Sequence, residues 1–309
     1  MAAALAASGV AAGTIGQPQF EDVYDALGQA EAFEPVGSFT GTTSTGSYAA
    51  SGVYLGDGWV VTAAHVVDSA ESLAFTVGGE TYEAQAWAYH VDWDPNDVLA
   101  GADIAMVYLG EDLNLDVDAA LLYTGETQDL VGELAVSTGY GLTGTGASGY
   151  DPASGTDTKH AGTNTIDMIY GDDVLISDLD SGAGWHSPTG SSSPTTLEYL
   201  IAPGDSGGGV FVYDDNLDDW ALAGINSFGL GLDGETDSDF GDLSGQVSIA
   251  YYDDWVYQVM TLGDDGLDSD ALDGVYGDAV FSFALTPEPS TLIAFAGLAA
   301  LGGARRRRD

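Results

Sequence analysis

Short runs rich in Val, Ile, Tyr and Phe, separated by Gly, Asp and Ser, extend over most of this chain and constrain its fold most strongly. Such runs have the length and the punctuation of β-strands joined by turns. Helical periodicity is scarce, the exceptions being a short amphipathic segment at 20–32 and an apolar pattern at 250–262. We therefore expect an all-β protein with one C-terminal helix.

Three segments that lie far apart in the sequence carry residue types used in nucleophilic catalysis. His65 ends an apolar run, Asp103 precedes another, and Ser206 lies in the motif Gly204-Asp205-Ser206-Gly207. A serine hydroxyl attacks a carbonyl poorly unless a base removes its proton, and a buried carboxylate fixes the tautomer of that base. The sequence therefore predicts His65, Asp103 and Ser206 as catalytic residues.

Alternatives exist for each of these positions. Asp92, Asp94 and Asp97 compete with Asp103, but they lie in a loop that contains Pro and Asn, whereas Asp103 directly precedes an apolar run that can bury it. His65 could instead be a satisfied core histidine. Asp103 and Ser206 could be ordinary turn residues.

With these motifs in the order His, Asp, Ser, the chain resembles the chymotrypsin/trypsin-like serine peptidases. Two further segments are similar to that family: 137–141 matches the strand that opens the second barrel, and 224–229 matches the strand that lines the substrate cleft. The resemblance implies a peptidase domain at 34–262. It would consist of two six-stranded antiparallel β-barrels, at about 34–125 and 126–250, and a helix at 250–262.

The resemblance also implies a role for each matched residue. Ser206 would be the nucleophile, His65 the general base and then the general acid, and Asp103 the carboxylate that orients the imidazole. The backbone N–H groups of Gly204 and Ser206 would form the oxyanion hole. Ser227 would donate a hydrogen bond to Asp103. No cofactor and no metal is expected.

The substrate pocket is expected at Leu200, Ser227, Phe228, Gly229 and Gly245. The resemblance implies that Leu200 lies at the base of the pocket and that the two glycines leave its walls open. An open pocket with an apolar floor favours a large apolar or aromatic side chain before the scissile bond. With no aspartate at that base, a preference for Lys or Arg is not supported.

The chain departs from the family pattern in three places. It has no cysteine, and so none of the family's disulfides. Gly209 stands where the family has proline, and no basic residue precedes Lys159, so the usual activation cleavage site is missing. In the family the freed N-terminus pairs with the aspartate that corresponds to Asp205. In this chain Asp205 must have another partner, or a different protease must trim the chain.

The charge balance is extreme, with 49 acidic and five basic residues and a formal net charge of −44. Such a surface repels itself at low salt, and at about 1 M salt a Debye length of roughly 3 Å screens the repulsion. We interpret the acidity as adaptation to a saline habitat; attraction of basic substrates is the alternative. Nucleic-acid binding is disfavoured because phosphate contacts need Lys and Arg. The Asp-rich segments 233–242 and 264–278 do not fit a helix-loop-helix calcium loop and are predicted to be solvated.

The C-terminus carries Pro287-Glu288-Pro289, an apolar span at 292–304 and four arginines at 305–308. This arrangement resembles the bacterial PEP-CTERM sorting signal, which implies cleavage by an exosortase-type membrane enzyme. The span is short for a bilayer, and the arginines would stay on the cytoplasmic side of the inner membrane. An ordinary tail anchor is the alternative. We assign 287–309 to this signal and 263–286 to an acidic spacer that ends in a strand at 279–285.

At the N-terminus, the first 14 residues are small and apolar but lack the basic region of a secretory signal. We assign 1–33 to a leader and pro-region, and we expect export because the C-terminal signal presupposes it. Together these features predict a monomeric serine endopeptidase at the cell surface or in the extracellular matrix, acting on protein or peptide substrates. A catalytically silent binding module on the same fold and an acidic, calcium-responsive matrix protein are the alternatives.

Overall fold

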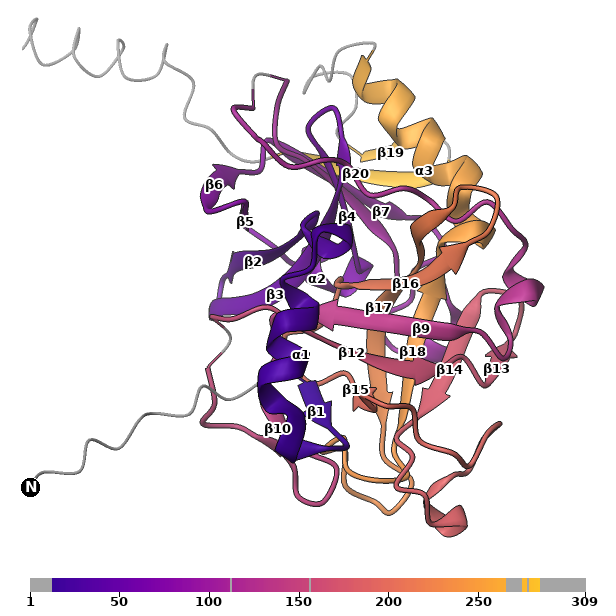
Figure 1. The fold of residues 1–309 in the computed structure, drawn as a ribbon. Helices are drawn as coiled ribbons and strands as arrows, with labels where there is room; N and C mark the ends of the chain where they lie inside the picture. Colours follow the sequence, from indigo (N-terminus) through magenta and orange to yellow (C-terminus); the bar gives the residue numbers. More distant parts are fainter. Residues whose placement is uncertain (1–12, 112, 156, 265–273, 277, 284–309) are drawn as a thin grey trace, which may run out of the picture.

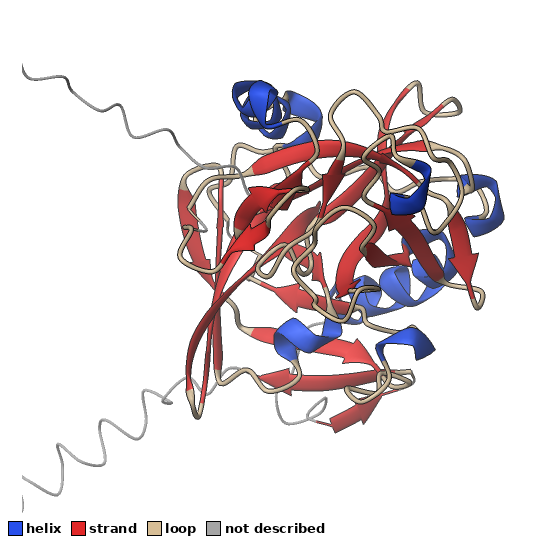
Figure 2. Cartoon of the chain, turned by 90° about the horizontal axis from the view of Figure 1, so that it is seen from below, coloured by secondary structure: helices blue, strands red, loops and turns tan. Residues whose placement is uncertain are grey.

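Three curled and mainly antiparallel β-sheets form the body of the molecule (Figure 1). The computed structural model describes residues 13–283, except 112, 156, 265–273 and 277. The predicted sorting signal at 287–309 and the first twelve residues of the predicted leader lie outside the described residues. Strands fill the centre of the molecule and the few helices lie around them (Figure 2).

The first sheet has nine strands in the order β19-β20-β7-β8-β4-β3-β2-β5-β6. Its core consists of apolar side chains that alternate along the strands and are fully buried, among them Phe39, Val53, Phe75 and Met106. The strands are β2 (Val36–Thr43), β3 (Gly46–Gly56), β4 (Trp59–Thr62), β5 (Ser72–Val77), β6 (Glu80–Glu83), β7 (Ala86–His90), β8 (Ala105–Tyr108), β19 (Gly274–Tyr276) and β20 (Ala279–Phe283).

The second sheet has seven strands in the order β12-β9-β16-β17-β18-β14-β13, and the third has four in the order β11-β10-β1-β15. The strands of the second sheet are β9 (Leu134–Gly139), β12 (His160–Thr165), β13 (Met168–Tyr170), β14 (Val174–Asp178), β16 (Gly209–Asp214), β17 (Asp219–Leu230) and β18 (Leu243–Ser248). Those of the third are β1 (Gly13–Ile15), β10 (Thr143–Thr145), β11 (Gly149–Asp151) and β15 (Tyr199–Leu200).

One apolar core joins the first sheet to the second. Phe33 packs against Phe211 of β16 with 5.1 Å between the ring centroids, and Phe211, Ile225 and Val247 belong to the same buried cluster as the side chains of the first sheet. The two sheets therefore face each other across a shared boundary, along which side chains from both can meet.

Apart from α3 (Ile249–Asp264), which has 16 residues, the helices are short. They are α1 (Glu21–Gly28), α2 (Ala64–Val67), α3 (Ile249–Asp264) and the 3-10 turns η1 (Pro18–Phe20), η2 (Glu31–Phe33), η3 (Val98–Ala100), η4 (Thr127–Leu130) and η5 (Gly184–His186). α3 packs through Tyr252, Trp255, Val256 and Val259, whose spacing places them on one face. Among the described residues, no helix has both the length and the apolar character that a membrane crossing requires.

The segment predicted as leader and pro-region is folded onto the domain from Gly13 onward. β1 pairs with β10 and β15, and α1 lies on β12, where a Cβ at Gly28 would come within 2.8 Å of the backbone of Lys159 and His160. Asp25 of α1 lies 2.7 Å from the His160 ring. Such close contacts make this segment part of the packed structure.

The predicted all-β class and the C-terminal helix are confirmed. The main sheets hold nine and seven strands rather than six each. The first sheet is larger because the hairpin β19–β20 follows the helix and adds to the edge strand β7, with Ala279 opposite His90.

Candidate active site

His65 and Asp103 meet because β4 and β8 are neighbours in the first sheet. Thr62 at the end of β4 pairs with Ala105 at the start of β8, which brings α2 next to the residues that precede β8. The backbone N–H of His65 donates to Oδ1 of Asp103 at 2.9 Å, and ring Nδ1 lies 2.8 Å from Oδ2. One carboxylate thus fixes both the backbone and the ring of the histidine.

A tight turn presents the Asp103 carboxylate. Gly101 has φ +78° and Ala102 φ +59°, and the Ala102 N–H donates to Oδ2 of Asp173 at 3.2 Å. A Cβ at Gly101 would stand 1.9 Å from the same carboxylate, so only glycine fits there. Asp103 is fully buried and accepts a further hydrogen bond from the hydroxyl of Ser227.

The pKa values of the pair diverge. Burial alone would lower the pKa of His65, but the charge of Asp103 and its hydrogen bond outweigh burial and raise that pKa above its ordinary value. Burial would raise the pKa of Asp103, yet the charge of His65 and hydrogen bonds from His65 and Ser227 together lower it. The carboxylate therefore stays ionised beside an imidazole that readily takes a proton.

Ser206 lies in the 202–208 turn, between β15 and β16, and β3 holds this turn from one side. The hydroxyl of Ser51 donates to the carbonyl of Gly204 at 2.9 Å, and the Ser51 N–H donates to the carbonyl of Ser206 at 2.8 Å. Gly204 has φ +101°, and a Cβ there would come within 2.9 Å of Gly141 Cα. This conformation favours glycine.

β17 holds the same turn from the other side. The N–H of Gly207 donates to the carbonyl of Asn226 at 2.8 Å, and Asn226 directly precedes Ser227, the partner of Asp103. A Cβ at Gly207 would also touch Thr62 at 1.9 Å, three positions before His65. Ser206 is thereby brought to the boundary between the two sheets, beside the ends of the strands that carry the other site residues.

Several polar groups of this turn remain available. Ser206 is partly exposed, and within the described part of the chain its hydroxyl forms no hydrogen bond. The backbone N–H groups of Gly204 and Ser206 likewise donate to no acceptor among the described residues. Unused N–H donors beside a serine hydroxyl are what a developing oxyanion requires.

The residues predicted for the substrate pocket lie on three strands. Leu200 is a buried residue of β15, Ser227, Phe228 and Gly229 are on β17, and Gly245 is opposite Phe228 on β18. The two glycines differ: a Cβ at Gly245 would stand 2.1 Å from the Phe228 ring, whereas one at Gly229 would meet nothing nearer than 3.9 Å. The space over Gly245 holds an aromatic ring, and the space over Gly229 is open.

Sequence reasoning missed two residues of this site. Ser51 joins the 202–208 turn to Tyr140, whose N–H donates to the same hydroxyl at 2.9 Å. Trp93, which is 8% exposed, places its ring 6.4 Å from that of His65, centroid to centroid. A buried serine within the mainly apolar run 49–55 was a signal for the first; the second lies in a loop whose path the sequence does not indicate.

Among the described residues, Asp237, Asp239 and Asp242 form a group of carboxylates whose oxygens lie within 4.8 Å of one another. Asp242 already accepts the backbone N–H groups of Leu232 and Ser238, at 3.2 and 3.0 Å. The group is therefore accounted for by the structure of its own loop, and we assign no metal to it.

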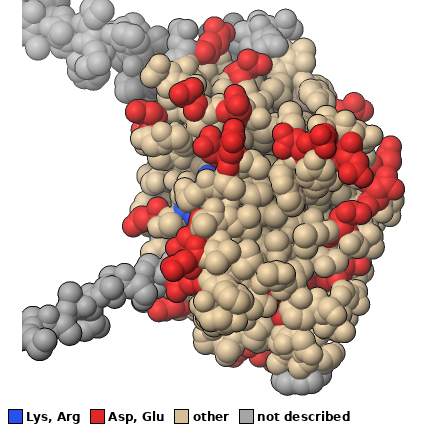
Figure 3. Space-filling model, in the orientation of Figure 1, with Lys and Arg blue, Asp and Glu red and all other residues tan. Residues whose placement is uncertain are grey.

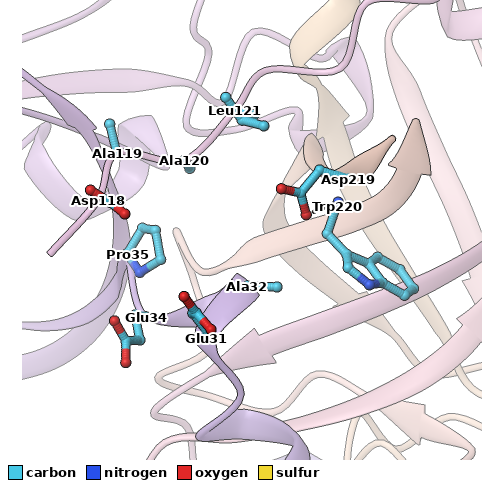
Figure 4. Close-up of a pocket in the computed structure, with 10 residues that line it drawn as sticks. All are labelled: Glu31, Ala32, Glu34, Pro35, Asp118, Ala119, Ala120, Leu121, Asp219 and Trp220. Atoms are coloured by element: carbon cyan, nitrogen blue, oxygen red, sulfur yellow. Dashed lines mark hydrogen bonds between the residues drawn. The ribbon is translucent and has the colours of Figure 1, made fainter. Parts of the chain in front are cut away.

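A separate hollow contains none of the predicted site residues. Pro35, Glu34 and Asp118 lie on one side of it and Asp219 and Trp220 on the other (Figure 4). Its carboxylates come from η2, from the segment before β9 and from β17. Its lining contains no serine, cysteine or histidine, so we do not assign the serine–histidine chemistry to it.

The comparisons with known proteins agree with this geometry. The family model for trypsin matches residues 28–256, most of the chain, and the chain therefore belongs to the trypsin family. A model of the PEP-CTERM protein-sorting motif matches residues 285–308. That motif marks an exported protein with a C-terminal sorting signal, of the kind that exosortases recognise. No curated protein matches the chain.

Solved structures are similar in fold. HL collagenase is 19% identical, with a TM-score of 0.55, and the match covers 75% of this chain and 95% of that one. The scabies mite inactivated protease paralogue S-I1 is 14% identical, with a TM-score of 0.53, and the match covers 75% of this chain and 96% of the other. At these identities the likeness concerns the chymotrypsin-like fold alone.

Proposed function

We propose that this protein is an exported serine endopeptidase in which Ser206, His65 and Asp103 cleave peptide bonds. The observation that carries the proposal is the fully buried Asp103 carboxylate, 2.8 Å from Nδ1 of His65. A buried charge is costly unless it is well satisfied, and here it is used to orient an imidazole whose other edge is open, with 33% of the side chain exposed.

The chemistry follows from the groups present. Nε2 of His65 takes the proton of Ser206 as the hydroxyl oxygen attacks the peptide carbonyl, and Asp103 stabilises the imidazolium that forms. The N–H groups of Gly204 and Ser206 donate to the oxyanion of the tetrahedral intermediate. His65 then protonates the leaving amine, and water, activated by the same imidazole, releases the acyl group from Ser206.

For the substrate, the proposal includes a preference for an apolar residue before the scissile bond. Leu200 provides an apolar side chain at the expected pocket base, and Gly229 has open space above it. Exosortase processing at the C-terminal motif would deliver the enzyme, as a monomer, to the cell surface or the extracellular matrix after transient anchoring in the inner membrane.

A binding module without catalysis is the second candidate. One of the similar solved structures is an inactivated protease paralogue, and the Ser206 hydroxyl forms no hydrogen bond within the described part of the chain. Catalytic hydrogen bonds are often completed only when substrate binds, so this second observation does not outweigh the histidine–aspartate geometry.

Labelling with a fluorophosphonate probe separates the two candidates, because only an activated serine reacts. We expect the mature protein to be labelled, Ser206→Ala not to be, and Ser193→Ala, at an exposed serine, to be labelled like the wild type. A folded, mature protein that resists the probe, or labelling that survives Ser206→Ala, contradicts the proposal.

A further inference from the structure

Asp205, directly before Ser206, is a buried carboxylate held by a tyrosine and two backbone N–H groups. It is fully buried. Its Oδ2 accepts the hydroxyl of Tyr199 at 3.1 Å and the N–H of Ala202 at 2.8 Å, and its Oδ1 accepts the N–H of Gly141 at 2.8 Å. None of the ion pairs among the described residues involves Asp205.

The ring of Tyr199 is clamped between glycines. Tyr199 is 1% exposed and pairs with Ile15 of β1. A Cβ at Gly13 would stand 2.3 Å from the phenol oxygen, and a Cβ at Gly162 would stand 2.3 Å from Tyr199 Cβ. The hydroxyl therefore has little room to leave the Asp205 carboxylate, because Gly13 of β1 lies directly against the phenol ring.

Asp205 in turn determines the path of the 202–208 turn. Its N–H donates to the carbonyl of Ala202 at 3.0 Å, and its own carbonyl accepts the N–H of Gly208 at 2.8 Å. Its carboxylate fills the space that Cβ atoms at Gly139 and Gly141 would take, at 2.4 and 2.5 Å. Withdrawing this side chain would move the N–H groups on either side of it, those of Gly204 and Ser206.

The protonation states suit this arrangement. Burial raises the pKa of Asp205 to about 6, while the hydrogen bonds from Ala202, Gly141 and Tyr199 act in the opposite direction. Burial and the nearby carboxylate raise the pKa of Tyr199 above its ordinary value. At neutral pH the aspartate accepts and the tyrosine donates.

We propose that Tyr199 is a positioning residue that holds the oxyanion-binding turn in its working conformation through Asp205, with a neutral hydroxyl in place of a cation. This proposal rests on the proposed function, because the turn has a task only if Ser206 is a nucleophile. In this arrangement the Tyr199 hydroxyl satisfies a buried carboxylate that pairs with no described cation.

The first test compares two tyrosines that each lose one buried hydroxyl. Tyr199→Phe removes the donor to Asp205. The matched control is Tyr24→Phe, whose hydroxyl contacts the carbonyl of Glu198 at 2.9 Å and the side chain of Gln17 at 2.7 Å. We expect kcat to fall about 10- to 100-fold in Tyr199→Phe with KM little changed, since losing an oxyanion donor outright costs roughly 100- to 1000-fold. The control should keep the wild-type kcat.

The second test measures how kcat falls as the pH is lowered. Removing the hydroxyl destabilises ionised Asp205, so its pKa rises and activity should be lost at a higher pH in Tyr199→Phe than in the wild type or in Tyr24→Phe. A double-mutant cycle with Asp205→Asn should show that the two changes are not additive, because both act through one contact. Equal kcat and equal pH profiles in the two tyrosine variants overturn the proposal.

Two further measurements keep the outcome decisive. If Tyr199→Phe does not fold, Asp205→Asn carries the test, and a wild-type kcat in that variant overturns the proposal. Infrared difference spectra report the carboxyl band of Asp205 without turnover, and its titration should move to higher pH in Tyr199→Phe. Failure of probe labelling in the wild type counts against the proposed function alone, whereas an unmoved carboxyl titration counts against the role of Tyr199 alone.

Discussion

The hydroxyl of Ser227 donates a hydrogen bond to the carboxylate of Asp103, which lies 124 positions earlier in the chain. The bond crosses from the second sheet to the first, and it supplements the two that Asp103 accepts from His65. With three donors, a fully buried carboxylate remains ionised. The contact thus links β17, the strand on which we expect the substrate to bind, directly to the orientation of the imidazole.

Replacing Ser227 by Ala should therefore weaken catalysis without destroying it. A hydrogen bond to a charged group contributes roughly 1.5–3 kcal/mol, and since about 1.4 kcal/mol corresponds to tenfold in rate, kcat/KM should fall about 10- to 100-fold. Ser177→Ala, at a buried serine of β14, is the control and should retain wild-type kcat/KM. Indistinguishable kcat/KM values for the two variants would show that the Ser227 contact is not used.

The pH dependence of kcat/KM should report the raised pKa of His65. Because only the neutral imidazole acts as a base, activity should fall as the pH drops through a value above 6.5, the ordinary pKa. In Asp103→Asn the charge that raises the pKa of His65 is gone, so the fall in kcat/KM at acidic pH should move to lower pH. The maximal rate should also drop by about 10⁴-fold. Proton NMR of the His65 ring provides the same titration independently, and an unchanged pKa in Asp103→Asn would contradict this account.

Motifs with local signatures could be predicted from the sequence, whereas contacts that depend on strand pairing could not. His65 follows an apolar strand and Asp103 precedes one, and the structure brings them together because β4 and β8 pair. Tyr199 gave no such signal. The role proposed for Tyr199 depends on the pairing of β15 with β1, in which Tyr199 lies opposite Ile15, 184 positions earlier. It depends also on where the 202–208 turn folds back. The number of strands in the first sheet was not predicted correctly for the same reason, because the pairing of β20 with β7 joins distant segments.

The two glycines of the expected substrate pocket should respond differently to a methyl group. Gly245→Ala places a Cβ 2.1 Å from the Phe228 ring, and overpacking of this kind typically costs about 1–3 kcal/mol of unfolding free energy. Gly229→Ala has space, so it should keep its stability and raise KM mainly for substrates with large side chains before the scissile bond. Denaturant titration and a peptide panel measure the two effects; equal destabilisation of both variants would contradict the packing described.

Buried carboxyl groups should make the protein more stable at mildly acidic pH. Burial is the main cause that raises the pKa of Glu198 and of Asp178, each to about 7. A carboxyl group with a folded-state pKa above its unfolded value stabilises the fold below the unfolded pKa, and that contribution is lost as the pH rises through the folded one. Unfolding free energy should therefore decline between about pH 4 and about pH 7, less steeply in Glu198→Gln than in Glu83→Gln, at an exposed position. A slope that Glu198→Gln leaves unchanged would assign the decline to other groups.

Salt should stabilise the fold, because the described surface carries many carboxylates and few opposing charges. Figure 3 shows Asp and Glu spread over the visible face with very few basic side chains among them, in line with the formal net charge of −44. Raising NaCl from about 0.1 M to about 1 M shortens the Debye length from roughly 10 Å to roughly 3 Å, so the repulsion among neighbouring carboxylates weakens and the melting temperature should rise by several degrees. Near pH 4 many carboxyl groups are protonated, and there the same salt step should have a smaller effect. A melting temperature that responds equally at both pH values would mean that salt acts on hydrophobic burial rather than on charge.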